Sequence, residues 1–360
     1  MQKILENAIN VIETDKIGSA VSTLGLMKTV NVQKSLKLPK IGDVVVVRAL
    51  GESVTYGNLE LPSGRLAKIN RNDVLLGVLG KRRALKGFVG DVPQKLAVGD
   101  KLHLLNMGGV MGECTGHHSS LSDAIELEFL GAACNSDGEI LNIGDKALPF
   151  ASSLKTTAPL VIVAGTCMNS GKTVAVTEII KQATHAGLSV AGAKLSGVAC
   201  LRDTLNMQDS GASWTASFLD CGLPSTVDVE NLAPMAKAVL NHLGTNNPDL
   251  IVVELGDGIL GGYSVDSILQ DVEIRAATSA FVFCASDYVG AWGGIELLKK
   301  QGITVDVVAG SVTDSQMGED YIKREFGVPA GNARRDGLGL FKMIEAKIKN
   351  AKRQFTLLAA

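Results

Sequence analysis

The sequence has little net charge and no long apolar run. Its formal net charge is −2, which gives no bulk attraction toward nucleic acid or an anionic membrane. No apolar stretch reaches the roughly 18 to 20 residues that a membrane span needs. The opening MQKILENAINVIETDK mixes charges into an amphipathic pattern that differs from a secretory signal. We therefore expect a cytoplasmic protein with neither a membrane nor a nucleic-acid partner.

The sequence also lacks paired cysteines. Its six cysteines include no CxxC motif, as is typical of reduced thiols and not of a disulfide framework or a structural zinc site. One metal-like cluster, Cys114, His117 and His118, is expected to form a polar turn, with a metal site as the alternative. The basic run from Lys81 to Lys86 is expected in a solvated loop, with contact to an anionic substrate or to a second domain as the alternative.

Length indicates two globular units, because 360 residues exceed one ordinary domain. Within residues 1–37 we expect a helix from Gln2 to about Glu13 and an irregular lead-in. Residues 38–150 alternate short β-type runs with turn signals and predict a small all-β barrel or sandwich. The turns are marked by pairs that tolerate tight backbone conformations: Gly42-Asp43, Asn72-Asp73, Gly90-Asp91, Gly99-Asp100 and Gly144-Asp145.

After a linker predicted at residues 151–158, apolar strands alternate with helical stretches. The strands include LVIVAG, SVAGAKLSG, DLIVVELGDG, AFVFCASD and ITVDVVAGSV. Such near-continuous apolar runs joined by helices predict a parallel sheet buried on both faces. The predicted class is therefore α/β, with residues 159–360 forming a sheet flanked by helices. Helices are predicted at Lys172–Ala186, Asp209–Leu219, Met235–Leu243, Ile295–Gln301 and Leu338–Arg353.

The stretch GTCMNSGKTV, Gly165 to Val174, follows the first of these strands and precedes a helix. Glycines let the backbone fold around a phosphate, so that amide N–H groups and the helix N-terminus point at the anion. Lys172 can reach terminal phosphate oxygens and the Thr173 hydroxyl can coordinate Mg²⁺. We prefer this interpretation to an accidental Gly-rich turn. The predicted nucleotide contacts are Gly165, Thr166, Asn169, Ser170, Gly171, Lys172, Thr173 and Val174.

The loop GTCMNSGKT resembles the phosphate loop GTDTxVGKT of dethiobiotin synthetases, a group of P-loop enzymes that use Mg-ATP. Three further motifs follow in the same order between Val161 and about Arg335. AGAKLSG resembles their KPVxSG loop, Gln208-Asp209-Ser210 their Ser-Asp-Ala motif, and the stretch from Val253 to Gly258 their VEGAGG. Cys167 and Met168 replace the Asp and second Thr of the family loop, so that family's own substrate is not implied.

The resemblance implies a metal site built from Thr173, Asp209 and Glu254, whose oxygens suit Mg²⁺. Lys172 and Lys194 would offset the charge that develops during phosphoryl transfer. Asp209 has a plain alternative as a helix cap. Asp203 is its rival as metal ligand, and Asp257 is the substitute for Glu254.

The same resemblance implies that loops after the last strands hold the base. Thr313, Asp314 and Pro329 lie in the corresponding stretches, Ser311–Ser315 and Gly327–Asn332. ATP is expected, with GTP as the alternative because a carboxylate at Asp314 could accept from guanine. Two Gly-rich loops, from Ala285 to Gly294 and from Gly256 to Tyr263, are expected to border the cleft. The first is a candidate switch or substrate lid.

These features predict a Mg-ATP-dependent enzyme that activates a small carboxylate or similar anionic metabolite by phosphoryl transfer. The alternative is a nucleotide-switched ATPase or GTPase that acts as a binding protein or metal chaperone. A polynucleotide kinase is disfavoured by the neutral charge and the lack of an aromatic and basic groove. The synthetase resemblance also implies a homodimer.

Overall fold

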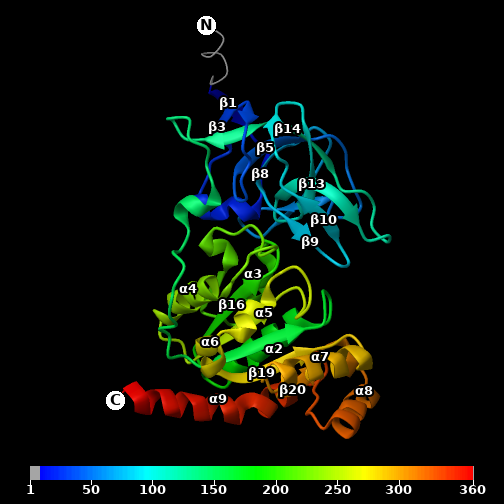
Figure 1. Ribbon diagram of the computed structural model, residues 1–360, viewed down its shortest axis with the longest axis vertical. Coiled ribbons are helices and arrows are strands. Elements are labelled where there is room, and N and C mark those ends of the chain that lie inside the picture. Colours follow the sequence, from blue (N-terminus) through cyan, green and yellow to red (C-terminus); the bar gives the residue numbers. More distant parts are fainter. Residues whose placement is uncertain (1–8, 360) are drawn as a thin grey trace. The chain divides into compact units, whose positions relative to one another are not determined.

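The computed structural model describes residues 9–359. The chain forms two compact units, drawn in Figure 1. The first contains the chain up to Leu148 together with two later segments, Val198–Arg202 and Phe218–Val227. The second contains Pro149–Gly197, Asp203–Ser217 and the chain from Asp228 onward. The chain therefore passes between the units several times. No helix in the described residues is long and apolar enough to cross a membrane.

The first unit is a β barrel. Strands β14, β5, β8, β13 and β12 pair in that order, and β12 pairs again with β14, so the ring closes. Large apolar side chains such as Phe129 and Leu75 fill its interior. The strands are β1 (Asn10–Glu13), β2 (Lys16–Ile17), β3 (Thr29–Gln33), β4 (Ser35–Leu36), β5 (Val44–Ala49), β6 (Asn58–Glu60), β7 (Leu66–Lys68), β8 (Val74–Leu79), β9 (Arg82–Arg83), β10 (Phe88–Asp91), β11 (Leu96–Ala97), β12 (Lys101–Asn106), β13 (Val110–His117) and β14 (Glu126–Cys134).

Two predictions for this half are corrected. Asn10–Glu13, expected as the end of a helix, forms strand β1 and pairs with β3. Its β-branched Val11 and Ile12 suit a strand, and the partner comes from residues expected to be irregular. Ile9 is not helical either, and the remainder of the predicted helix lies outside the described residues. The basic run from Lys81 is not wholly solvated, because Arg82 is buried and its guanidinium donates to Tyr56 Oη at 2.7 Å.

The second unit is a parallel sheet with the strand order β17-β16-β18-β15-β19-β20, and β15 lies inside it. The strands are β15 (Leu160–Gly165), β16 (Val190–Ser196), β17 (Trp214–Ser217), β18 (Leu250–Leu255), β19 (Thr278–Cys284) and β20 (Val307–Ala309). The α-helices are α2 (Lys172–His185), α3 (Arg202–Asp209), α4 (Ala233–Gly244), α5 (Val265–Gln270), α6 (Val272–Ala277), α7 (Tyr288–Lys300), α8 (Gln316–Tyr321) and α9 (Gly337–Ala359).

Helices cover both faces of this sheet (Figure 1). Alternate residues of β15 point to opposite faces. Val161 and Val163 share one core with α2 and α9, whereas Ile162 lies on the other face and lines a hollow with residues of α5 and α6. The arrangement confirms the predicted class, a P-loop α/β domain with a parallel sheet and a smaller β domain.

Two predicted elements of this unit are wrong. The helix expected at Asp209–Leu219 is instead the end of α3, strand β17 and a short 3₁₀ turn at Phe218–Cys221. The Gly-rich stretch after β19, expected as a loop, becomes helix α7 from Tyr288. Asp287 caps this helix by accepting from Gly290 N at 2.8 Å. Gly294 lets α7 lie on the sheet, because a Cβ there would stand 2.1 Å from Phe283 Cζ.

Candidate functional site

The phosphate loop follows β15 at the carboxyl edge of the sheet and leads into α2. Two of its residues take positive φ, Asn169 at 64° and Gly171 at 101°. At Gly171 an added Cβ would approach Gly310 Cα to 2.8 Å, so both the backbone twist and the crowding require glycine. Helix α2 begins at Lys172 with no side-chain cap. No side chain therefore caps its first amides, and uncapped amides at a helix start are groups that can bind an anion.

Lys172 is folded back into this loop. It is 6% exposed, and its ammonium donates to the carbonyl oxygens of Cys167 at 2.7 Å and Asp257 at 2.5 Å. Burial lowers the pKa of Lys172, and the nearby carboxylate of Glu254 opposes this shift. The ammonium of Lys172 therefore lies between the loop that follows β15 and the loop that follows β18, where two backbone carbonyl oxygens and the Ser170 hydroxyl accept from it.

Glu254 lies beside the start of α2 and is 1% exposed. Its Oε1 accepts from Thr173 Oγ1 at 3.1 Å and from Lys194 Nζ at 2.6 Å. Its Oε2 is buried and has no hydrogen-bond partner. A buried carboxylate oxygen without a partner is costly. Glu254 Oε2, at the carboxyl edge of the sheet, is therefore an acceptor to which a ligand could supply the missing partner.

Lys194 joins two carboxylates. Its ammonium is 2.6 Å from Glu254 and 2.8 Å from Asp203 Oδ2. Burial lowers the pKa of Lys194, but the two carboxylates outweigh that effect and hold the pKa above its ordinary value. Lys194 is thus a fixed charge shared by the acidic pair.

The two predicted metal-ligand candidates of α3, Asp203 and Asp209, lie in different surroundings. Asp203 is in the first turn of α3 and reaches Lys194, whereas Asp209 is the last residue of α3 and is exposed. Six residues along a helix correspond to about 9 Å and to a different face. The structure therefore brings Asp203, and not Asp209, to Lys194 and Glu254, and a metal at either aspartate stays a prediction. Asp257 contributes its backbone carbonyl to Lys172.

The loop after β18 packs directly on the phosphate loop, as expected for the stretch from Gly256. Ile259 N donates to Gly165 O at 2.9 Å. A Cβ at Gly258 would lie 2.3 Å from the Thr166 carbonyl oxygen, so only glycine permits this approach. The side chains of Thr166 and Cys167 contact the segment after β19. Thr166 Oγ1 is 3.4 Å and Cys167 Sγ is 3.5 Å from Ser286 Oγ.

A small pocket adjoins the other side of the phosphate loop, where Ser311 N donates to Ser170 O at 3.2 Å. Asp314 Oδ1 accepts from Asn332 Nδ2 at 2.9 Å. Thr313 is fully buried and shapes the loop by donating to Gly310 O. Pro329, predicted here, is exposed, and its carbonyl accepts from Val308 N. The pocket is lined by Gly171, Val174, Gly310, Ser311, Asp314, Asn332, Ala333 and Arg334.

The cysteine and histidine cluster of the first unit was expected in a polar turn, but Cys114 and His117 lie in strand β13. His117 Nε2 is 3.2 Å from Asp123 Oδ1, and His118 Nδ1 is 2.7 Å from Ser120 Oγ. Cys114 Sγ contacts Gly116 O at 3.4 Å. In residues 9–359 no three His, Cys, Asp or Glu side chains gather as ligands for one metal ion.

No protein-family profile matches the chain, and no curated protein matches it. Solved structures do. Chloroplast FtsY from Physcomitrella patens is 13% identical with a TM-score of 0.36, over 55% of this chain and 70% of that chain. A DUF1611 family protein from Anabaena variabilis is 13% identical with a TM-score of 0.43, over 59% and 66%. The hydrogenase maturation factor HypB from Archaeoglobus fulgidus is 17% identical with a TM-score of 0.31, over 54% and 77%. Likenesses of this size assign no family, and the function rests on the site.

The sequence names Asp203 only as a rival metal ligand, although an acidic residue in the first turn of a helix after Lys194 is a recognisable signal. It includes Asn332 only as the end of a loop, and it gives no signal for Arg334, which lines the small pocket. Their approach to Asp314 and Val174 depends on long-range packing, which local sequence patterns do not report.

Proposed function

We propose that the second unit binds a Mg-nucleoside triphosphate through Gly165–Val174 and hydrolyses its terminal phosphoryl bond. The observation that carries this proposal is the orphaned Oε2 of Glu254 beside Thr173, at the mouth of the phosphate loop. The uncapped start of α2 and the ammonium of Lys172 supply donors for the phosphates.

The donor set fits magnesium. Mg²⁺ is held by one or two carboxylates together with hydroxyl, water and phosphate oxygens. Thr173, Glu254 and Asp203 would hold it here, and the ion would neutralise charge on the phosphates. Lys172 would exchange its carbonyl partners for phosphate oxygens. Lys194 would hold both carboxylates in place.

The pairing of Lys194 also helps to choose between two candidate functions, hydrolysis of the nucleotide and transfer of its phosphoryl group to an acceptor. An acceptor-binding lysine must be free to meet a carboxylate substrate, but Lys194 already spans Glu254 and Asp203. This pairing favours a nucleotide hydrolase or switch over a synthetase. Phosphoryl transfer to a small anionic metabolite is the second candidate, since the loop at Gly258 could face an acceptor. A homodimer remains a prediction of the sequence resemblance.

Base recognition favours guanine. Asp314 lies in the pocket beside Asn332 and near Val174. A carboxylate only accepts hydrogen bonds, and guanine offers N–H groups along one edge, whereas adenine offers an acceptor there. We therefore propose GTP as the preferred nucleotide, with ATP as the competing substrate.

Calorimetric titration with Mg-GTP and Mg-ATP tests binding, and release of phosphate tests hydrolysis. We expect GTP to bind more tightly, Lys172→Ala to abolish binding, and Asp314→Ala to remove the preference for GTP. Addition of a pool of small carboxylic and amino acids separates the two candidates. Formation of a phosphorylated acceptor would support transfer, and hydrolysis indifferent to the pool would support the switch. Absence of heat with either nucleotide would refute both.

A further inference from the structure

A hollow of about 400 Å³ lies in the second unit at the opposite edge of the sheet from the phosphate loop. Its lining includes Ile162, Thr278 and Asp306, which lie in or near the amino-terminal halves of β15, β19 and β20. The phosphate loop, in contrast, follows the carboxyl end of β15. Its volume is within the range of about 300–1,000 Å³ that small-molecule sites occupy. It takes no part in the nucleotide site.

One wall of this hollow is apolar. Largely buried side chains from β15, α5, α6 and β19 form it together with half-buried Ile303, which precedes β20. The apolar residues are Ile162, Ile268, Leu269, Ile274, Phe281 and Ile303. A second hollow of about 280 Å³ adjoins it, sharing Thr278, Ser279 and Lys347 and extending to Asn350. The lining of the second hollow is more polar than that of the first, so the apolar wall belongs to the first hollow alone.

The charged side chains of the hollow do not balance. Its lining contains two cations, Arg275 and Lys347, and one anion, Asp306. Asp306 is fully engaged, because Oδ1 pairs with Lys347 at 2.7 Å and Oδ2 accepts from Phe281 N at 2.7 Å. Lys347 and Asp306 therefore neutralise each other at one end of the hollow.

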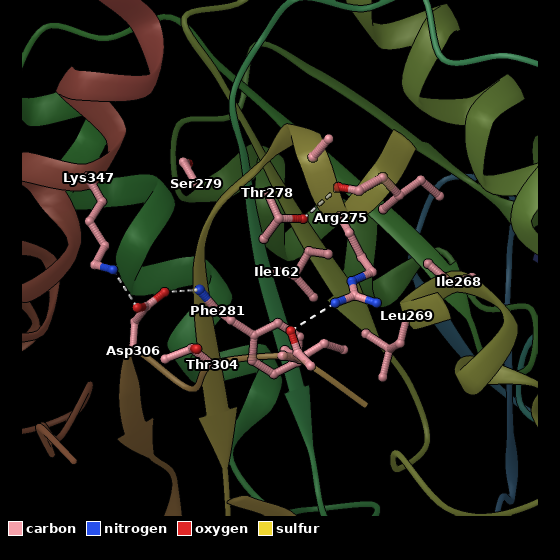
Figure 2. Close-up of a pocket in the computed structure, with 14 residues that line it drawn as sticks. Ile162, Ile268, Leu269, Arg275, Thr278, Ser279, Phe281, Thr304, Asp306 and Lys347 are labelled. Atoms are coloured by element: carbon pink, nitrogen blue, oxygen red, sulfur yellow. Dashed lines mark hydrogen bonds and ion pairs between the residues drawn. The ribbon is translucent and has the colours of Figure 1, made fainter. Parts of the chain in front are cut away.

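Arg275 carries the remaining charge. Its Nη2 donates to Gly302 O at 2.8 Å, and no carboxylate pairs with it among the ion pairs of the described residues. Figure 2 shows its guanidinium directed into the hollow, with Leu269 on one side and Phe281 on the other. A guanidinium held in place by one carbonyl still offers further N–H donors in a fixed plane, a geometry that matches a carboxylate.

We propose that this hollow binds a small amphiphilic carboxylate, with the acid group on Arg275 and the apolar body against Ile268, Leu269 and Phe281. The charge excess selects an anion, and the apolar wall selects a hydrocarbon or aromatic body. The site is independent of the nucleotide site and does not rest on the proposed hydrolysis.

Octanoate is the probe, titrated into the full chain by calorimetry, with acetate and 1-octanol as comparisons. We expect saturable octanoate binding, and acetate and octanol weaker by about tenfold or more because each lacks one half of the recognition. Arg275→Met should weaken octanoate by about tenfold or more while leaving octanol unchanged. Arg275 is exposed, so the variant should fold, and its thermal melting is checked.

Lys342→Met is the matched control, because Lys342 is an exposed cation of α9 outside the hollow. Thr304→Trp fills the exposed rim and should block octanoate and octanol alike, while Lys172→Ala should leave octanoate binding intact. The proposal is overturned if octanoate shows no saturable binding, if octanol binds as tightly as octanoate, or if the variants at 275 and 342 behave alike.

Discussion

Replacing Glu254 with glutamine removes one charge from the acidic cluster and keeps the side chain's size. In the structure Oε1 accepts from Thr173 at 3.1 Å and from Lys194 at 2.6 Å, and Oε2 has no partner. The amide retains the oxygen acceptor and brings a nitrogen donor in place of the second oxygen. Only the charge, and the ability to share a cation, are lost.

The effect on folding is moderate because Lys194 keeps Asp203 at 2.8 Å. Removing the sole partner of a buried charge costs about 3–5 kcal/mol. Here one of two partners loses its charge, and we expect a decrease of about 1–3 kcal/mol in the free energy of unfolding, measured with urea. The effect on metal use is larger. Loss of a residue that supports a metal typically weakens binding by about 10- to 100-fold, and we expect that loss in the Mg²⁺-dependent part of nucleotide affinity.

Calorimetry with GTP, in Mg²⁺ and in EDTA, separates the two effects. Glu254→Gln should lose affinity in Mg²⁺ and change little in EDTA. Asp209→Asn is the control, since it removes an exposed carboxylate at the far end of α3. If Glu254→Gln binds Mg-GTP like the natural protein and Asp209→Asn does not, the assignment of the cluster is wrong.

Three further outcomes are expected. Lys194→Met leaves its two carboxylate partners without a cation and should lower the free energy of unfolding by about 3–5 kcal/mol; a loss below about 1 kcal/mol, the level of an exposed pair, would contradict the burial argument. Burial lowers the pKa of Lys172 in the folded protein below the ordinary 10.5 that it has in the unfolded chain. Between the folded and the unfolded pKa the unfolded chain binds more protons than the folded protein, so the free energy of unfolding rises with pH. Lys172→Met should flatten that part of the stability curve, and an unchanged slope would count against it. Gly293→Ala, in open space on α7, should stabilise by about 0.5–1 kcal/mol, whereas Gly294→Ala meets the Phe283 ring and should destabilise by about 1–3 kcal/mol; equal melting temperatures would refute the packing of α7.

Much of the second unit could be predicted because its signals are local. An apolar run followed by glycines and a lysine reports a strand, a loop and a helix within one stretch, and the structure shows them at Leu160–His185. Lys194 and Glu254 could be paired as candidates because both end apolar strands, and parallel strands bring their carboxyl ends to one edge.

Other features depend on contacts that are distant in sequence. Strand β1 forms because a partner strand lies beside it, and helix α7 has a glycine at 294 because the Phe283 ring occupies the space that a side chain would need there. The family spacing favoured Asp209, whereas α3 starts earlier and brings Asp203 to Lys194. The hollow around Arg275 is lined by residues from α5, α6, α9 and the ends of three strands, so no single stretch of sequence predicts it.

The cluster's charges explain why metal and nucleotide should bind together. Glu254 and Asp203 bring two negative charges and Lys194 one positive charge, so the cluster presents one net negative charge to a divalent cation. One net charge attracts Mg²⁺ weakly, since the ion gives up its water reluctantly and needs several oxygen ligands. In the proposed function, phosphate oxygens held by Lys172 and the start of α2 would supply the missing charge and ligands. Lys194 would thereby weaken binding of the metal alone to the acidic pair, and we expect the Mg-nucleotide complex to be the species that binds.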